Sequence, residues 1–139
     1  MWYTLTYVEL ILLGLIQMTT LQIKNNSNPN LSLRTIIADT FFSKLMGLMF
    51  IKKLEENSGL LLSDRYESRI NSSIHMLFMN FDLCVVWLDK NLLVVDVKKA
   101  KKWRPAYFPR AAAQHVLETG VAHINDFSIG DQLSFEYEK

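Results

Sequence analysis

Hydrophobic and polar residues alternate near both ends of the chain, a pattern typical of strands that bury one face. Near the start, residues 20–24 (TLQIK) and 31–39 (LSLRTIIAD) alternate on either side of a dense turn signal, NNSNPN. Near the end, residues 133–138 (LSFEYE) alternate strictly. We therefore expect a β-hairpin that opens the domain and a half-buried final strand with one wet face.

The most apolar long stretch lies in the middle of the chain. Residues 83–88 (LCVVWL) have no polar face, which is typical of a strand inside a packed sheet or barrel. A tight turn, DKN, follows, and residues 92–98 (LLVVDVK) return as the paired strand. Two further short strands are predicted, one at residues 59–62 (GLLL) and one that ends near residue 118.

One segment changes to a helical period. Apolar residues recur three to four positions apart in FFSKLMGLM, with Asp39 or Thr40 placed to cap the start and Gly47 placed to end it. We expect a short helix from about residue 41 to residue 46.

Length and composition place these elements in one domain. The chain has 139 residues, of which half are hydrophobic and 21% are charged, the profile of a folded globular protein. The remaining stretches are predicted to be a polar loop at residues 63–73, a basic connection at 98–110 and one helical turn at 121–124. The predicted fold class is mainly β with an α+β tendency: a single compact β-sandwich or partly open barrel with one short helix near residues 41–46.

Residues 1–17 are apolar and precede the predicted domain, residues 18–139. They lack a basic start and a small-residue cleavage site, they carry Glu9, and they fall short of the ~20 residues of a spanning helix. Two interpretations stay open: a weak signal-anchor, or sequence upstream of a true start at Met18. We expect a cytoplasmic protein if Met18 is the start, and otherwise a membrane-anchored or exported one that meets the membrane only through residues 1–17.

Charge and cysteine content exclude several classes of protein. The net charge of +1 gives no global attraction to nucleic acid or to a membrane surface. Cys84 is the single cysteine, which excludes an internal disulfide, a CxxC redox pair and a cysteine-rich zinc site. The three histidines show no tight metal-binding spacing, and we expect neither a metal nor a cofactor.

Five motifs in order are similar to a known family. They are ADTFFSKLMGLMF, GLLL, SIHMLFMNFDLCVVWLDKNLLVV, HVLE and IGDQL. Between about Thr20 and Tyr137 the chain resembles DUF192, also called UPF0127, and the order of the motifs makes the resemblance specific. The resemblance implies a small, mostly-β sandwich or partly open barrel, and it implies no established activity.

The chain departs from the family pattern at three positions. Residues 75–89 align without gaps to a block that typically reads H-x-F-F-M-R-F-P-I-D-V-x-F-L-D. Asp82 stands where proline is usual and Cys84 where aspartate is usual, and in an earlier block Lys44 stands where arginine is common. If the family's carboxylate does chemistry, this chain has either moved it two residues along the same strand face or lost it.

Polar residues that interrupt the apolar stretch are the first candidates for a site. The functional interpretation places His75, Asn80 and Asp82 in a polar pocket at the mouth of a barrel. The alternative is that Asn80 and Asp82 satisfy backbone groups where the strand starts, with His75 on a loop. Cys84 is expected to behave as a small hydrophobe rather than a nucleophile. Glu118 is predicted either to face the same pocket or to pair with a basic side chain.

A basic and aromatic run follows the central hairpin and gives the second set of candidates. Its possible anion-binding residues are Lys98, Lys99, Lys101, Lys102 and Arg104. Such a run suits phosphates or single-stranded nucleic acid, but lysines at the end of a strand also protect a sheet edge, and we favour that interpretation. Trp103, with Pro105, is expected to anchor the loop onto the core rather than to stack on a base.

We predict a non-catalytic domain that binds a small ligand or a partner protein at the barrel mouth. The candidate ligand-binding residues are His75, Asn80, Asp82, Trp103, Arg104 and Glu118. Two alternatives stay open: an enzyme for a polar or anionic small molecule with Asp82 as acid/base, and a nucleic-acid-contacting module that uses Lys98–Arg104. We lean toward a monomer, toward a protein without enzymatic activity, and away from nucleic acid as the partner.

Overall fold

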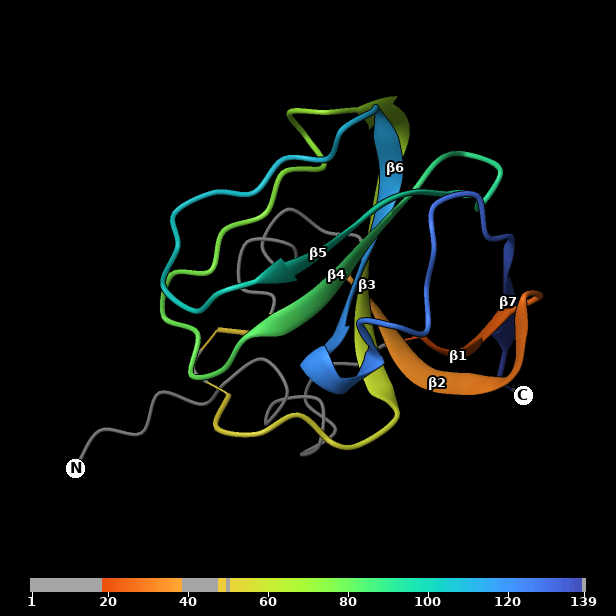
Figure 1. Cartoon of the computed structure of the whole chain (residues 1–139), viewed down its shortest axis with the longest axis horizontal. Helices are drawn as coiled ribbons and strands as arrows, with labels where there is room; N and C mark the ends of the chain where they lie inside the picture. Colours follow the sequence, from red (N-terminus) through yellow and green to blue (C-terminus); the bar gives the residue numbers. More distant parts are fainter. Residues whose placement is uncertain (1–18, 39–47, 50, 139) are drawn as a thin grey trace.

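The computed structural model describes residues 19–38, 48–49 and 51–138, and these form one seven-stranded sheet with the order β5-β4-β6-β3-β2-β1-β7 (Figure 1). The elements are β1 (Thr20–Asn25), β2 (Asn28–Ala38), β3 (Ser58–Ser68), β4 (Leu83–Leu88), β5 (Val94–Ala100), β6 (Ala113–Gly120), the 3₁₀ turn η1 (Val121–His123) and β7 (Leu133–Tyr137). The prediction of a single, mainly β sheet domain is confirmed. The helix predicted over residues 41–46 and the apolar segment 1–17 lie outside the described residues.

The opening hairpin forms as predicted, and the last strand pairs with it. β1 and β2 are antiparallel, with Thr20 opposite Ile36. β7 adds to the other side of β1, with Leu21 opposite Tyr137. The buried side of β7 ends early, since Leu133 is buried but Tyr137 is 65% exposed. As a result, β1 lies between β2 and the strand that comes last along the chain.

The sheet is not closed, yet its two edges meet at one end. The N–H of Leu133 donates to the carbonyl of Leu92 (3.0 Å), and the N–H of Val94 donates to the carbonyl of Asp131 (2.9 Å). Gly130 in turn donates its N–H to the carbonyl of Val94 (2.8 Å). These bonds join the start of β5 to the segment before β7, which gives the partly open barrel that was predicted.

β3 is longer than the sequence indicates. The predicted strand at residues 59–62 is present, but the polar stretch that follows continues the strand as far as Ser68, so the loop predicted at residues 63–73 is wrong in its first half. The reason is pairing: Ser63 lies opposite His115 and, beyond an irregularity in the register, Ser68 lies opposite Ala113, so β6 pairs with the polar segment at its two ends. Backbone hydrogen bonds, unlike side-chain burial, leave no periodic signal in the sequence.

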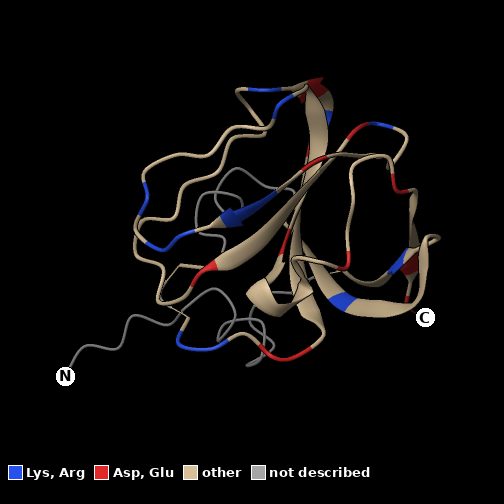
Figure 2. Cartoon of the chain, in the orientation of Figure 1, with Lys and Arg blue, Asp and Glu red and all other residues tan. Residues whose placement is uncertain are grey.

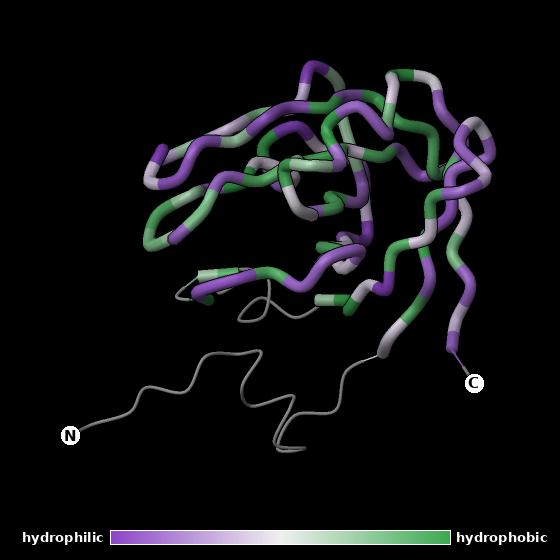
Figure 3. Tube along the Cα trace, turned by 60° about the horizontal axis from the view of Figure 1, so that its bottom comes forward, coloured by the Kyte–Doolittle hydropathy of each residue, from purple (hydrophilic) through white to green (hydrophobic). Residues whose placement is uncertain are grey.

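β4 is buried along its whole length, as its apolar sequence predicts. It pairs with β5 on one side and β6 on the other. Its alternate residues belong to different hydrophobic clusters: Cys84, Val86 and Leu88 to one, and Leu83, Val85 and Trp87 to the other. Figure 3 shows the alternation of hydrophobic and polar residues along the trace. The sheet therefore carries a core on each face, and neither face of β4 meets water.

The helical turn predicted at residues 121–124 is present as η1. In the part of the chain that the structure describes, no helix is both long enough and apolar enough to cross a membrane.

Candidate functional site: paired loops beside the β4–β5 hairpin

Two loops continue the β4–β5 hairpin beyond the sheet. Leu83 at the start of β4 lies opposite Ala100 at the end of β5. Residues 74–82 and 101–110 therefore leave the sheet next to each other, and we call these two segments the loop pair. Their proximity follows directly from the register of the hairpin.

Backbone hydrogen bonds hold the loop pair together. Met76 donates its N–H to the carbonyl of Arg104 (2.9 Å) and accepts the N–H of Trp103 (2.7 Å) at its own carbonyl. Further out, Ile74 and Tyr107 exchange two bonds of 3.0 and 2.9 Å as an antiparallel bridge. The loops thus behave as a short irregular ladder rather than as two independent connections.

Buried side chains fix the loop pair to the core. Ile74, Met76 and Met79 are 6%, 0% and 2% exposed, and all three belong to the cluster that contains Val85 and Trp87. Because Leu77 and Phe78, between Met76 and Met79, are exposed, the first loop has one side in the core and one side in solvent.

Two aromatic rings lie on the solvent side of the loop pair. Phe78 and Trp103 are 43% and 56% exposed, and their ring centroids lie 5.2 Å apart in an edge-to-face arrangement. Both have positive φ, 61° and 70°, a region that side chains other than glycine rarely occupy. The expectation that Trp103 anchors the loop onto the core is therefore wrong, because its indole packs against another surface ring.

The three polar candidates of the first loop hydrogen bond to backbone groups. Asp82 Oδ1 accepts the N–H of Lys102 (2.9 Å), which ties the two loops together at their base. Asn80 Nδ2 donates to the carbonyl of Ile51 (2.8 Å), and His75 Nδ1 accepts the N–H of Leu77 (3.3 Å). Asp82 and His75 are half-buried, whereas Asn80 is exposed. Asn80 and Asp82 thus make the contacts expected if their role is to satisfy backbone groups near the start of β4.

The basic run does not form a single patch. Lys98 Nζ donates to the carbonyl of Phe108 (2.5 Å) and lies 3.6 Å from Asp96 Oδ2. Lys99 follows it on the opposite face of β5, an edge strand of the sheet. The other three cations, Lys101, Lys102 and Arg104, are exposed and flank Trp103 within the loop pair. Figure 2 shows the basic residues at the end of β5 and along the adjoining loop.

Glu118 lies apart from the loop pair. It sits in β6 with Leu60 of β3 and Val85 of β4 as its cross-strand neighbours, and it is 5% exposed. Burial raises the pKa of its carboxyl to about 7. The structure therefore separates this residue from the other candidate ligand-binding residues.

Cys84 has the environment of a structural thiol. It is fully buried, and burial, with a smaller contribution from the charge of Asp126, raises the pKa of the thiol to about 12. Such a thiol stays protonated at neutral pH, so it is not a nucleophile. No three His, Cys, Asp or Glu side chains among the described residues are grouped so that they could hold a metal ion.

One polar contact of β3 was not predicted. Ser63 Oγ lies 2.8 Å from His115 Nδ1, across the strand pair β3–β6. Burial is the main influence on His115 and lowers the pKa of its imidazole, despite opposing charges from Asp64 and Asp89. The ring is therefore neutral at pH 7. It also packs edge-to-face against the ring of Phe135, with the two ring centroids 5.8 Å apart. No local pattern predicts this contact, because the two residues are 52 positions apart.

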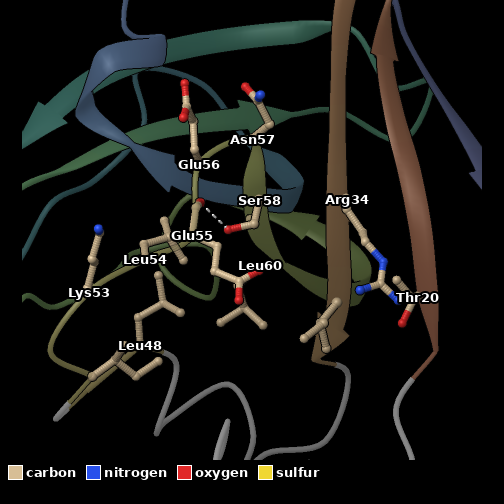
Figure 4. Close-up of a pocket in the computed structure, with 13 residues that line it drawn as sticks. Thr20, Arg34, Leu48, Lys53, Leu54, Glu55, Glu56, Asn57, Ser58 and Leu60 are labelled. Atoms are coloured by element: carbon tan, nitrogen blue, oxygen red, sulfur yellow. Dashed lines mark hydrogen bonds between the residues drawn. The ribbon is translucent and has the colours of Figure 1, made fainter. Parts of the chain in front are cut away.

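A pocket on another part of the sheet was also not predicted. It has a volume of about 440 Å³ and lies beside β2 and β3 (Figure 4). Its lining residues are Thr20, Arg34, Ile36, Leu48, Ile51, Lys53, Leu54, Glu55, Glu56, Asn57, Ser58, Gly59 and Leu60. The signal that was available is the presence of Leu54 in the otherwise polar stretch KKLEENSG.

Fold and loops together define a small, mainly β domain, built on one partly closed sheet with an aromatic loop pair at one end. The chain belongs to the family DUF192, described as "Uncharacterized ACR, COG1430", whose profile matches residues 21–135. The resemblance found in the sequence motifs is thereby confirmed, and the function of this family is not established.

Relatives support the same assignment. The chain is 44% identical over 101 residues to a UPF0127 protein of Thermococcus kodakarensis and 40% identical over 108 residues to one of Thermococcus sibiricus. These matches cover 71% and 76% of this chain, and the chain spans 62% and 68% of the length of those relatives. A solved structure from Sinorhizobium meliloti, provisionally described as a transcription regulator, has the same fold: the TM-score is 0.75 at 15% identity, with 86% of this chain and 94% of that chain covered.

Proposed function

We propose that this protein is a non-catalytic binding domain that holds an acidic segment of a partner protein on the loop pair. The observation that carries the proposal is the pair of exposed rings, Phe78 and Trp103, each on left-handed backbone. Backbone strain of this kind costs on the order of 1–3 kcal/mol per residue and is concentrated at functional sites.

The strained positions are held by the rest of the loop pair. The bonds between Met76 and both Trp103 and Arg104, together with the buried Met79, keep the rings in place before any partner arrives. A surface that is rigid in advance loses less conformational entropy on binding. Aromatic residues are also the side chains that most often dominate the binding energy of protein interfaces.

The positive charge on the loop pair favours an acidic partner. Lys101, Lys102 and Arg104 are exposed on either side of Trp103, and the carboxylate of Asp82 in the facing loop already accepts a backbone N–H. An acidic segment would therefore meet complementary charge at the rim and an aromatic surface at the centre.

The enzyme alternative has less support. Its proposed acid/base, Asp82, is occupied by the bond from Lys102 that joins the two loops. The nucleic-acid alternative also has less support, because Lys98 is bound to Phe108 and Asp96 and Lys99 lies on the opposite face of β5, which leaves three of the five cations on the loop pair. The provisional description of the Sinorhizobium meliloti protein is consistent with this alternative but concerns a protein that is only 15% identical.

A peptide library displayed on phage tests the proposal with the full chain as target. We expect the enriched peptides to combine Asp or Glu with an aromatic or aliphatic residue. Trp103→Ala and Phe78→Ala should each weaken binding of a synthetic copy at least about tenfold, as expected for central aromatic contacts. Tyr137→Ala is the matched control, because it removes an exposed aromatic ring from β7, at the other end of the strand order.

Three results would contradict the proposal. The library could yield no acidic peptides, or the enriched peptides could bind the Trp103→Ala and wild-type proteins equally. A fluorescent oligothymidine that binds the loop pair, with affinity falling steeply as salt is added, would instead support the nucleic-acid alternative. Unchanged melting temperatures of the variants would show that they are folded, so that a loss of binding comes from the missing ring.

A further inference from the structure

The pocket beside β2 and β3 has an aliphatic interior. The side chains that form it are Ile36, Leu48, Ile51, Leu54 and Leu60. The volume of about 440 Å³ is in the range of sites that hold a small molecule. None of its lining residues belongs to the loop pair, although Asn80 of the loop pair donates a hydrogen bond to the carbonyl of one of them, Ile51.

Two opposite charges face this interior from different elements. Arg34 projects from β2, and Glu55 projects from the segment before β3. Figure 4 shows the Glu55 carboxylate directed toward Leu60, whereas the side chains of Glu56 and Lys53 are directed away from the interior. The two charges therefore lie at the mouth, on opposite sides of an apolar space.

Arg34 is paired with Glu138 rather than with Glu55. The Arg34 Nε and Nη2 atoms contact the Glu138 carboxylate at 3.1 and 3.4 Å, and Nη1 takes no part in these contacts. The pKa of the Arg34 guanidinium is raised mainly by Glu138, with a smaller contribution from the charge of Glu55. The charge of Glu55 thus acts on Arg34, and no hydrogen bond or ion pair joins the Glu55 carboxylate to another of the described residues.

The walls of the pocket are held by local hydrogen bonds. The carbonyl of Asn57, a residue at φ 57°, accepts the N–H of Arg34 (3.0 Å). Ser58 Oγ donates to the carbonyl of Glu55 (2.5 Å), and Asn80 Nδ2 donates to the carbonyl of Ile51 (2.8 Å). Both charged residues and one aliphatic wall are thus positioned without a ligand, as a binding site requires.

We propose that this pocket binds a free aliphatic α-amino acid. Its ammonium group would pair with Glu55, its carboxylate with the Nη1 side of Arg34, and its side chain with the aliphatic interior. A zwitterion satisfies both charges at once, whereas a simple acid or a simple amine leaves one of them facing an apolar ligand. This proposal is independent of the partner binding assigned to the loop pair.

Isothermal titration of the full chain tests the proposal with L-leucine as the probe. N-acetyl-L-leucine lacks the ammonium group, L-leucinamide lacks the carboxylate, and glycine lacks the aliphatic side chain. We expect L-leucine to bind at least about tenfold more tightly than each of these three, the difference that one charge-assisted contact supplies. Equal binding of the acetylated compound or of the amide would overturn the proposal, and so would the absence of binding by L-leucine.

A pair of glutamate variants locates the site. Glu55→Gln should weaken L-leucine binding at least about tenfold, because it removes the charge that faces the pocket. Glu136→Gln makes the same chemical change on an exposed side chain of β7 that does not line the pocket, and it should leave binding unchanged. Equal loss in both variants, or loss in neither, would overturn the assignment. Trp103→Ala should retain L-leucine binding, which separates this test from that of the loop pair.

Discussion

Glu118 is a buried residue of β6 whose directly opposite residues on the two neighbouring strands are both apolar. Leu60 and Val85 flank it across the sheet, and 5% of the residue is exposed. The described residues provide no ion pair to this carboxyl. Because burial disfavours the charged form, its pKa rises to about 7, so the folded protein keeps a proton that the unfolded chain loses.

This shift predicts a stability that falls as pH rises. Exposed glutamate has a pKa of about 4.3, so below that pH both states are protonated and the penalty is absent. Between about pH 4.3 and pH 7 the unfolded state binds fewer protons, and the free energy of unfolding should fall by roughly 4 kcal/mol in total. Measuring the free energy of unfolding in urea at pH 4, 5, 6, 7 and 8 covers this range and tests the prediction.

Glu118→Gln is neutral at every pH and should remove this part of the pH dependence. Glu56→Gln is the control, because Glu56 is exposed and should leave the slope unchanged. If the Glu118→Gln protein lost stability with pH as steeply as the wild type, the pH dependence would have to come from another group.

At the scale of elements, β4 shows which features the sequence encodes locally. Its two apolar faces predicted an interior strand, and the structure places it between β5 and β6 with a cluster on each face. The polar half of β3 shows the opposite case, since its strand conformation depends on pairing with β6.

Val85 and Val86 test whether both faces of β4 carry core. They are adjacent, fully buried and directed into different clusters. Val85→Ala and Val86→Ala should each lower the free energy of unfolding by about 2 kcal/mol, from lost burial plus the cavity left behind. Tyr66→Ala, on the exposed end of β3, should change it by no more than about 0.5 kcal/mol. A loss confined to one of the two valine variants would show that only one face is packed.

The same contrast explains how much of the candidate site could be predicted. The loop pair was foreseeable, because its two segments lie next to the two ends of the β4–β5 hairpin: Asp82 directly precedes Leu83, and Lys101 directly follows Ala100. The exposure of Trp103 could not be predicted, because it depends on a left-handed backbone conformation at a position that is not glycine. The pocket depends on the parallel pairing of β2 with β3, in which Arg34 lies opposite Ser58, and such non-local contacts leave no pattern in the chain.

At the scale of the whole molecule, β1 joins the first part of the domain to its last strand. β1 pairs with β2 and β7, and the N–H of Glu138 donates to the carbonyl of Thr20 (3.2 Å). The two ends of the sheet domain are thus joined to each other through the backbone.

This closure predicts that residues 18–139 fold alone. The shortened chain should melt in a single transition within about 5 °C of the full chain, a shift that corresponds to roughly 1 kcal/mol for a domain of this size. Circular dichroism during heating measures it. A shortened chain that is unfolded at 25 °C would show that residues 1–17 contribute to the core.

The central position of β1 also bears on how the protein is made. During translation β1 and β2 leave the ribosome early, but the partner that covers the remaining side of β1 is the last described strand to be synthesised. Until then the nascent hairpin exposes a row of unpaired N–H and C=O groups, the kind of edge on which chains aggregate. The sheet is therefore completed only when β7 pairs with β1, and until then the open edge of the hairpin makes the folding chain prone to aggregation.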